Sequence, residues 1–197
     1  MTIAISILSL LIAVIFHEVA HGYVAYRFGD PTAKLQGRIS LNPLVHIDWL
    51  GSIILPGILI LSGAPFLIGW AKPVPINPNY FQNPLRDMMW VAIAGPLTNI
   101  TIALIASTLL KFHLNSVFDY FLAVSISINI VLALFNLFPI PPLDGSRILM
   151  YIAPKSLQQF LTSIEPYGLV ILFFLVYLNV FEKILPFLIH PILEALL

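Results

Sequence analysis

Two histidines and a glutamate lie close together in an apolar stretch near the start of the chain, in the order His17-Glu18-Val19-Ala20-His21. On a helix, residues four positions apart share one face, so both imidazoles can reach a single metal ion. Imidazole nitrogen is a common ligand of Zn²⁺, and a neighbouring carboxylate can take a proton from a water molecule that the metal activates. The pattern therefore predicts a zinc site with hydrolytic chemistry, in which His17 and His21 bind the metal and Glu18 acts as the general base.

A catalytic zinc site uses three protein ligands, and Asp144 is the best candidate for the third. It follows the proline-rich stretch 139–142, whose backbone cannot continue a helix. Non-helical backbone at membrane depth is tolerated where it is buried in protein or lines a wet cavity. Asp144 could instead cap a short helix over residues 145–151, and the two roles are compatible. The other acidic candidates lie at the ends of apolar segments or in the tail: Glu165, Glu182 and Glu194.

The chain that must position these residues is strongly apolar. Of its 197 residues, 59% are hydrophobic and 9% are charged, whereas an ordinary soluble domain has about 25% charged residues. So few charges cannot cover a soluble fold, and several apolar stretches are long enough to span a bilayer. A carboxylate within a spanning helix is unfavourable by about 2.5–3.5 kcal/mol on insertion scales. Glu18 within such a run therefore indicates function.

The sequence predicts an all-α polytopic membrane protein with about five transmembrane helices and a small membrane-associated β element. The apolar runs cover residues 3–26, 49–68, 88–110, 118–138 and 167–181. The second run contains prolines and glycines and can span, bend or re-enter. The tail, 184–197, is apolar but is expected to be broken by Pro186 and Pro191. No repeat or linker divides the chain, so residues 1–197 are expected to form a single integral-membrane domain.

Two short polar stretches are the candidates for extended structure. Residues 34–41 alternate apolar with polar side chains and then reach Asn42-Pro43, which predicts a short strand and a turn. Residues 72–77 are extended by their prolines and suit an edge strand at best.

Charge and cysteine content exclude two other classes of protein. Nine basic residues balance nine acidic ones and form no basic patch, so no nucleic-acid partner is expected. The chain has no cysteine, which excludes a disulfide scaffold.

Taken together, these motifs resemble the site-2 protease family of intramembrane zinc metalloproteases. The two main motifs are Phe16-His17-Glu18-x-x-His21-Gly22 and Asn136-x-x-Pro139-x-Pro141-x-x-Asp144-Gly145. Supporting matches are Gly95-Pro96-Leu97-Thr98-Asn99, the stretch 37–43 and the stretch 69–75. The similarity covers residues from about 10 to 150. It points to the compact prokaryotic branch, which lacks an inserted PDZ domain.

The resemblance implies one zinc ion per chain, held by His17, His21 and Asp144, with Glu18 as general base and acid. It also implies that Asn136 orients the substrate or stabilises the oxyanion and that Asn99 plays a supporting part, although an amide in an apolar helix can equally join helices by hydrogen bonds.

The expected activity is hydrolysis of peptide bonds in or near transmembrane segments of membrane-protein substrates, by a multi-pass protein of a prokaryotic cell membrane. Residues 34–41 would resemble the family's membrane-associated sheet and could pair with an unwound substrate.

Two other functions remain open at this stage. A metal transporter also buries histidines and carboxylates, but it needs polar groups along a path through several spans, and here they converge on one site. A catalytically inactive relative could act as a binder or chaperone, and the intact Glu18 argues against it.

The sequence leaves the oligomeric state open. It contains neither a Gly-x-Ser-Gly-type nucleophile element nor the several histidine boxes of a lipid hydroxylase or desaturase.

Overall fold

The computed structural model describes residues 2–63 and 69–197, and every regular element in those ranges is helical. The elements are α1 (Thr2–Arg27), α2 (Thr32–Leu35), η1 (Pro43–His46), η2 (Trp49–Ile54), α3 (Leu55–Leu61), η3 (Pro78–Tyr80), α4 (Pro84–Leu110), α5 (Ser116–Asn136), α6 (Asp144–Ile152), α7 (Lys155–Ile164), η4 (Glu165–Tyr167), α8 (Gly168–Tyr177) and α9 (Val180–Leu196).

Four helical segments within the described residues are long and apolar enough to cross a membrane. They are Thr2–Arg27, Pro84–Leu110, Ser116–Asn136 and the joined segment Lys155–Tyr177. The prediction of a polytopic, helical membrane protein is therefore confirmed for the described part of the chain.

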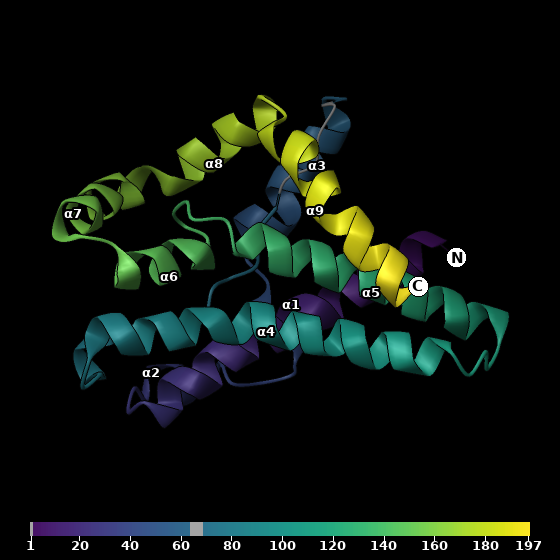
Figure 1. Ribbon diagram of the computed structural model, residues 1–197, viewed down its shortest axis with the longest axis horizontal. Coiled ribbons are helices and arrows are strands. Elements are labelled where there is room, and N and C mark those ends of the chain that lie inside the picture. Colours follow the sequence, from purple (N-terminus) through teal and green to yellow (C-terminus); the bar gives the residue numbers. More distant parts are fainter. Residues whose placement is uncertain (1, 64–68) are drawn as a thin grey trace.

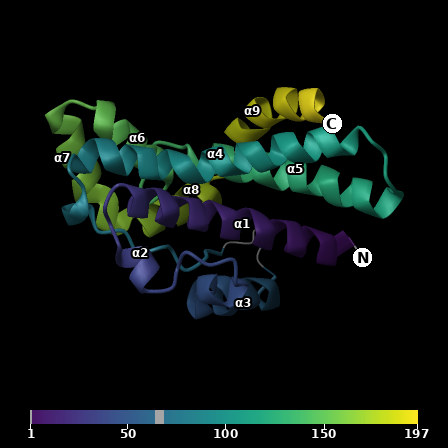
Figure 2. The ribbon, with the colours of Figure 1, turned by 90° about the horizontal axis from the view of Figure 1, so that it is seen from below.

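The helices α1, α4 and α5 pack against one another and form the centre of the molecule (Figure 1). Pro84 starts α4 at a position where its missing N–H is not needed. Asn115 caps α5, because its side chain accepts a hydrogen bond from the Phe118 N–H at 2.9 Å. Seen at right angles to the first view, α9 and α3 lie on opposite sides of these three helices (Figure 2).

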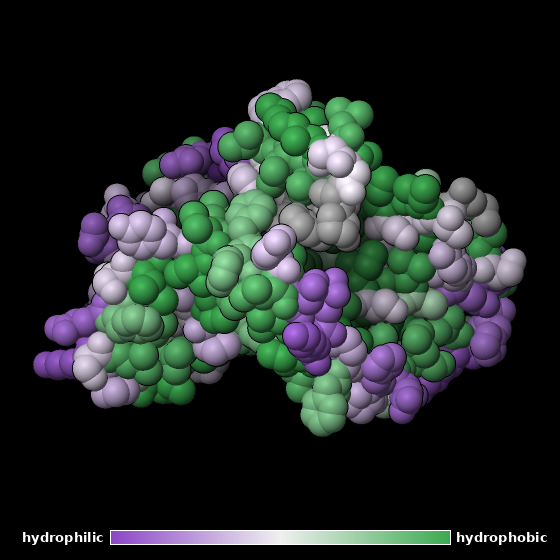
Figure 3. Space-filling view, turned by 90° about the horizontal axis from the view of Figure 1, so that it is seen from above, coloured by the Kyte–Doolittle hydropathy of each residue, from purple (hydrophilic) through white to green (hydrophobic). Residues whose placement is uncertain are grey.

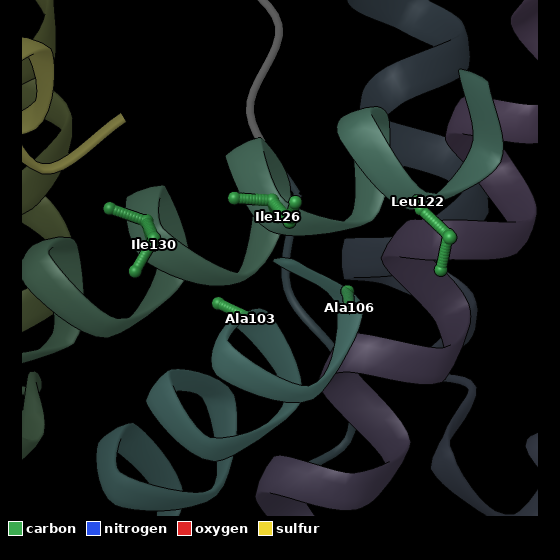
Figure 4. Packing of buried hydrophobic residues seen from close by; sticks show 5 residues of the cluster. All are labelled: Ala103, Ala106, Leu122, Ile126 and Ile130. Carbon is green, nitrogen blue, oxygen red and sulfur yellow. The ribbon is translucent and has the colours of Figure 1, made fainter. Parts of the chain in front are cut away.

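Small residues allow α4 and α5 to approach closely. Ala103 and Ala106 of α4 face Leu122, Ile126 and Ile130 of α5, and all five are buried (Figure 4). Small side chains at helix interfaces are typical of membrane proteins, where close van der Waals packing drives association. Partly buried apolar residues of α9 pack against the same cluster.

Large apolar side chains remain exposed over much of the molecule's surface. Figure 3 shows one face on which hydrophobic side chains predominate, with hydrophilic ones at both ends of the long axis and a further group near the middle. The large exposed apolar area fits a protein whose sides face lipid.

The number of spans differs from the prediction of about five. In the second apolar run, the π-helix η2 and the helix α3 cover only Trp49–Leu61, about 20 Å of helix rise where a hydrocarbon core needs about 30 Å. The end of that predicted run, 64–68, lies outside the described residues. The last predicted span begins earlier than expected, because α7, η4 and α8 form one helical segment.

The predicted break in the tail is wrong. The helix α9 continues through Pro186 and Pro191 from Val180 to Leu196. Prolines are tolerated in helices of membrane proteins when neighbouring structure compensates for the lost hydrogen bonds, and α9 packs along α5.

The predicted β element is also wrong for the described residues. The stretch 34–41 begins inside α2, and the chain turns at Gly37, whose φ is +63°. Two residues before α2, the Asp30 carboxylate accepts hydrogen bonds from the backbone N–H (2.9 Å) and the hydroxyl of Thr32. Such local side-chain bonds give the backbone an alternative to a sheet ladder. Residues 72–77 are extended but belong to no strand.

Candidate metal centre

The helices α1 and α6 bring His17, His21 and Asp144 together. The Nε2 atoms of His17 and His21 lie 3.2 and 3.3 Å from the same carboxylate oxygen, Asp144 Oδ2. The two imidazole rings stand edge to face with their centroids 4.6 Å apart. One ligand atom from each of the three residues lies within 4.8 Å of the other two. Both histidines are buried.

Asp144 is placed by a close approach between α6 and the end of α5. The next residue, Gly145, is packed so tightly that an added Cβ would lie 2.1 Å from the Leu137 carbonyl oxygen. Asp144 is the first residue of α6, Leu143 is the N-cap, and no side chain caps this helix. The expectation that Asp144 caps a short helix is therefore wrong, because its carboxylate is directed to the histidines instead.

Each histidine is also held at its second nitrogen. His17 Nδ1 lies 2.6 Å from Asn99 Oδ1, and His21 Nδ1 lies 2.7 Å from the Val91 carbonyl oxygen. A carbonyl oxygen only accepts hydrogen bonds, so Nδ1 is the protonated nitrogen in each ring. The Nε2 lone pairs then point to Asp144, which leaves them free for a metal. Metal-binding histidines in proteins are commonly oriented in this way.

This arrangement of three acceptors fits a cation. Two Nε2 lone pairs and Asp144 Oδ2 face one another, and Oδ2 is buried without a hydrogen-bond partner. Buried polar atoms in native proteins nearly always have partners. Two imidazole nitrogens and one carboxylate oxygen form a donor set that Zn²⁺ uses in catalytic sites.

Gly95 lets α4 pass directly over the two imidazoles. A Cβ at this position would lie 2.5 Å from both His17 Cε1 and His21 Nε2. Any larger residue would therefore occupy the space between α4 and the candidate metal centre.

Glu18 is held beside the cluster by the extended segment 72–77. Its Oε2 accepts a hydrogen bond from the Val74 N–H at 2.8 Å. Two other side chains hold this segment: Arg38 donates to the Lys72 and Pro73 carbonyls at 2.6 and 3.2 Å, and Asp30 accepts from the Asn77 N–H at 2.7 Å.

The two asparagines singled out by the sequence occupy different positions. Asn99 is fully buried and contacts His17. Asn136 lies at the end of α5, where its Nδ2 donates to the Leu132 carbonyl of the same helix at 3.0 Å. In the ranges that the structure describes, no hydrogen bond joins Asn136 to the three clustered residues.

Asn129 was missed by the sequence analysis. It is fully buried on α5, and its Oδ1 accepts a hydrogen bond from Asn99 Nδ2 at 2.8 Å. Its position, seven residues before Asn136 in the same apolar run, is the signal that the sequence offered.

The family of the chain is shown by its similarity to known proteins. A sequence model of peptidase family M50 matches residues 5–118 and 113–178. The chain belongs to peptidase family M50. This is the site-2 protease family, so the M50 chain is a zinc metalloprotease by family, as the sequence motifs predicted.

Relatives of this M50 peptidase occur in bacteria and archaea. It is 38% identical to YwhC of Bacillus subtilis over 175 residues, which cover 84% of this chain and 76% of YwhC. It is 31% identical to Rip2 of Mycobacterium tuberculosis over 82% of this chain and 62% of Rip2. It is 26% identical to the zinc metalloprotease MJ0392 of Methanocaldococcus jannaschii over 78% of this chain and 35% of that protein. No solved structure gives a significant match.

Proposed function

We propose that this M50 peptidase hydrolyses peptide bonds in or near transmembrane segments of membrane-protein substrates, in a prokaryotic cell membrane. The observation that carries the proposal is the cluster of His17, His21 and Asp144 within the depth of a spanning helix. His17 lies about 22 Å of helix rise from Thr2 and about 15 Å from Arg27. A substrate bond that reaches this cluster must itself be at membrane depth.

One zinc ion per chain would be held by the two Nε2 atoms and the Asp144 carboxylate. When bound in such a site, zinc activates a water molecule and polarises a carbonyl group. The residues of the chain supply the rest. His17 and His21 keep their Nδ1 protons directed away from the site, and Asp144 contributes the negative charge.

Glu18 is the proposed general base and acid. One of its oxygens is bound to the Val74 N–H, which fixes the carboxylate beside the ligands. Within the described ranges, no hydrogen bond occupies the other oxygen, Oε1, which can take a proton from the attacking water and pass it to the departing amine. Asn136 and Asn99 keep the parts assigned by the family resemblance, namely orienting the substrate or oxyanion and supporting the site.

The structure favours this function over a metal transporter. A transporter needs ligands in succession across the membrane. Among the described residues, the histidine and acidic side chains form one group able to hold a metal.

The proposal is tested by replacing Glu18 with glutamine and measuring cleavage of a single-span reporter in liposomes. We expect Glu18→Gln to lower the cleavage rate by roughly 10²- to 10⁴-fold while the zinc content of the purified protein stays at one per chain.

Glu194→Gln changes an exposed carboxylate of α9 and serves as the matched control, which should cleave at the wild-type rate. Wild-type cleavage that persists after zinc chelation would argue against a metalloprotease. Undiminished cleavage by Glu18→Gln would remove Glu18 from the mechanism.

A further inference from the structure

We propose that Asn129 is a positioning residue for the metal centre, and that it acts through Asn99 to keep the proton of His17 on Nδ1. The inference rests on the proposed function, because it assumes that His17 Nε2 binds the metal. Asn99 and Asn129 are both fully buried at the junction of α1, α4 and α5. They form one line of hydrogen bonds that ends at the His17 ring.

A main-chain carbonyl of α5 orients Asn129, the residue of this line that is farthest from His17. Asn129 Nδ2 donates to the Ser125 carbonyl at 2.9 Å and lies 3.3 Å from the Ser125 hydroxyl. Because a carbonyl only accepts, the NH₂ group of Asn129 must face Ser125, and Oδ1 must face Asn99. Asn99 therefore presents its own NH₂ group to Asn129, at 2.8 Å.

Asn99 then has one orientation left for its oxygen. Its Nδ2 donates both protons, one to Asn129 Oδ1 and one to the Ala13 carbonyl at 3.1 Å. Its Oδ1 is directed at His17 Nδ1, which must be the protonated nitrogen. The lone pair on His17 Nε2 is thus fixed through Asn99 by two main-chain carbonyls: that of Ala13 on α1, which Asn99 contacts directly, and that of Ser125 on α5, which acts through Asn129. Without Asn129, one amide proton of Asn99 would be buried without a partner, a state that native proteins avoid.

His21 provides a reference within the same site. Its Nδ1 contacts a main-chain carbonyl, that of Val91, directly, so no side chain relays its orientation. A change at Asn129 should therefore alter His17 and leave His21 unchanged. General destabilisation of the protein would affect both rings, which lie one helical turn apart.

The first experiment measures the tautomer of each ring. Full-length protein in detergent micelles is labelled with nitrogen-15 at histidine, stripped of metal by chelation and examined by NMR at a pH where imidazole is uncharged. In the wild type, both rings should carry the proton on Nδ1. In Asn129→Leu we expect His17 to show a mixture of tautomers while His21 stays as in the wild type. In the described part of the chain, the hydroxyl of Ser127 on α5 donates to the Ala123 carbonyl of its own helix, so Ser127→Ala should leave both rings unchanged.

The second experiment measures Zn²⁺ affinity by competition with a chelator. Partners that orient metal ligands typically change affinity by 10- to 100-fold, and we expect Asn129→Leu to weaken Zn²⁺ binding by roughly tenfold. If Asn129 acts through Asn99, the double variant Asn99→Leu/Asn129→Leu should bind Zn²⁺ no more weakly than Asn99→Leu alone.

Two outcomes would overturn the proposal: an unchanged His17 tautomer in Asn129→Leu, or additive losses of affinity in the double variant. If the leucine variant fails to fold, Asn129→Ser withdraws the same acceptor with less apolar volume and takes its place in both measurements. Neither readout requires cleavage. A protein that shows the expected tautomers and affinities but does not cleave a reporter would contradict the proposed function while supporting this inference.

Discussion

Gly95 affects both the packing of α4 against α1 and the geometry of the candidate metal centre. The hydrogen atom in place of a side chain lets α4 lie against both imidazoles. Added volume in a tightly packed interior destabilises a protein by about 1–3 kcal/mol and shifts its neighbours. The neighbours here are the rings of His17 and His21.

At this scale, Gly95→Ala should weaken Zn²⁺ binding at least tenfold, because the new methyl group occupies space beside His21 Nε2. Affinity is measured by chelator competition on the purified protein. Gly57→Ala is the matched control, since a Cβ on that glycine of α3 meets no atom within 4 Å. Equal affinity in Gly95→Ala and the control would show that α4 can move away from the imidazoles without disturbing them.

At the candidate site, the sequence predicted the residues that belong to a recognisable motif. The four-residue separation of His17 and His21 predicted a shared helical face, and the structure places both Nε2 atoms at one carboxylate. Asp144 was predicted from its proline-rich context. Asn129 was not predicted, because its seven-residue separation from Asn136 is a single spacing that does not indicate which side chain it contacts. Its partner, Asn99, lies 30 residues away in the chain.

At the scale of elements, the segment 72–77 is held by side chains of neighbouring elements and by one main-chain hydrogen bond, from the Lys72 N–H to the His46 carbonyl at 2.8 Å. Arg38 contributes two of these contacts and is itself buried. The segment in turn donates the Val74 N–H to Glu18. Within the described residues, Arg38 forms no hydrogen bond with Glu18 or with the proposed metal ligands, so it would influence the general base through the segment 72–77.

Arg38→Met should lower the cleavage rate by roughly 10- to 100-fold, because small displacements of a catalytic group have effects of this size. Zinc content should remain at the wild-type level, since the hydrogen bonds that the structure gives for Arg38 go to the Lys72 and Pro73 carbonyls and not to a proposed ligand. Both quantities are measured on one preparation. Lys34→Met, which changes an exposed cation bonded to Tyr26, is the control and should cleave normally. A parallel loss of zinc would mean that the segment supports the ligands themselves.

Helices were easier to predict than the connections between them. Long apolar runs gave α1, α4 and α5 within a few residues. The alternation in 34–41 indicated a strand, but the carboxylate of Asp30 accepts hydrogen bonds from Thr32, and the chain turns in the left-handed region at Gly37, so this stretch forms the end of α2 and a turn. Proline spacing predicted a broken tail, whereas packing on α5 keeps α9 helical. In the tail, packing against a helix distant in sequence overrode the local preference, whereas stretch 34–41 is shaped by hydrogen bonds and a turn within a few residues of it.

For the whole molecule, the candidate metal centre joins parts of the chain that are far apart in sequence. His17 and His21 lie on the first helix and Asp144 on α6, which packs against α4. A metal bound by all three residues in the folded state has no equivalent site in the unfolded chain. Binding therefore stabilises the fold by an amount that grows with the ratio of free metal to its dissociation constant.

Removing zinc should consequently lower the Tm of the protein in detergent. With free zinc at about one hundred times its dissociation constant, the stabilisation is about 2.7 kcal/mol, and the expected decrease in Tm on chelation is on the order of 5 °C or more. Asp144→Ala should lose most of this dependence, because two imidazoles alone bind zinc weakly. Glu18→Gln should keep it in full, since Glu18 is assigned to proton transfer. Chelation could instead shift the Tm of Asp144→Ala as much as that of the wild type. In that case a residue other than Asp144 would complete the zinc site, and metal binding would not join α1 to α6.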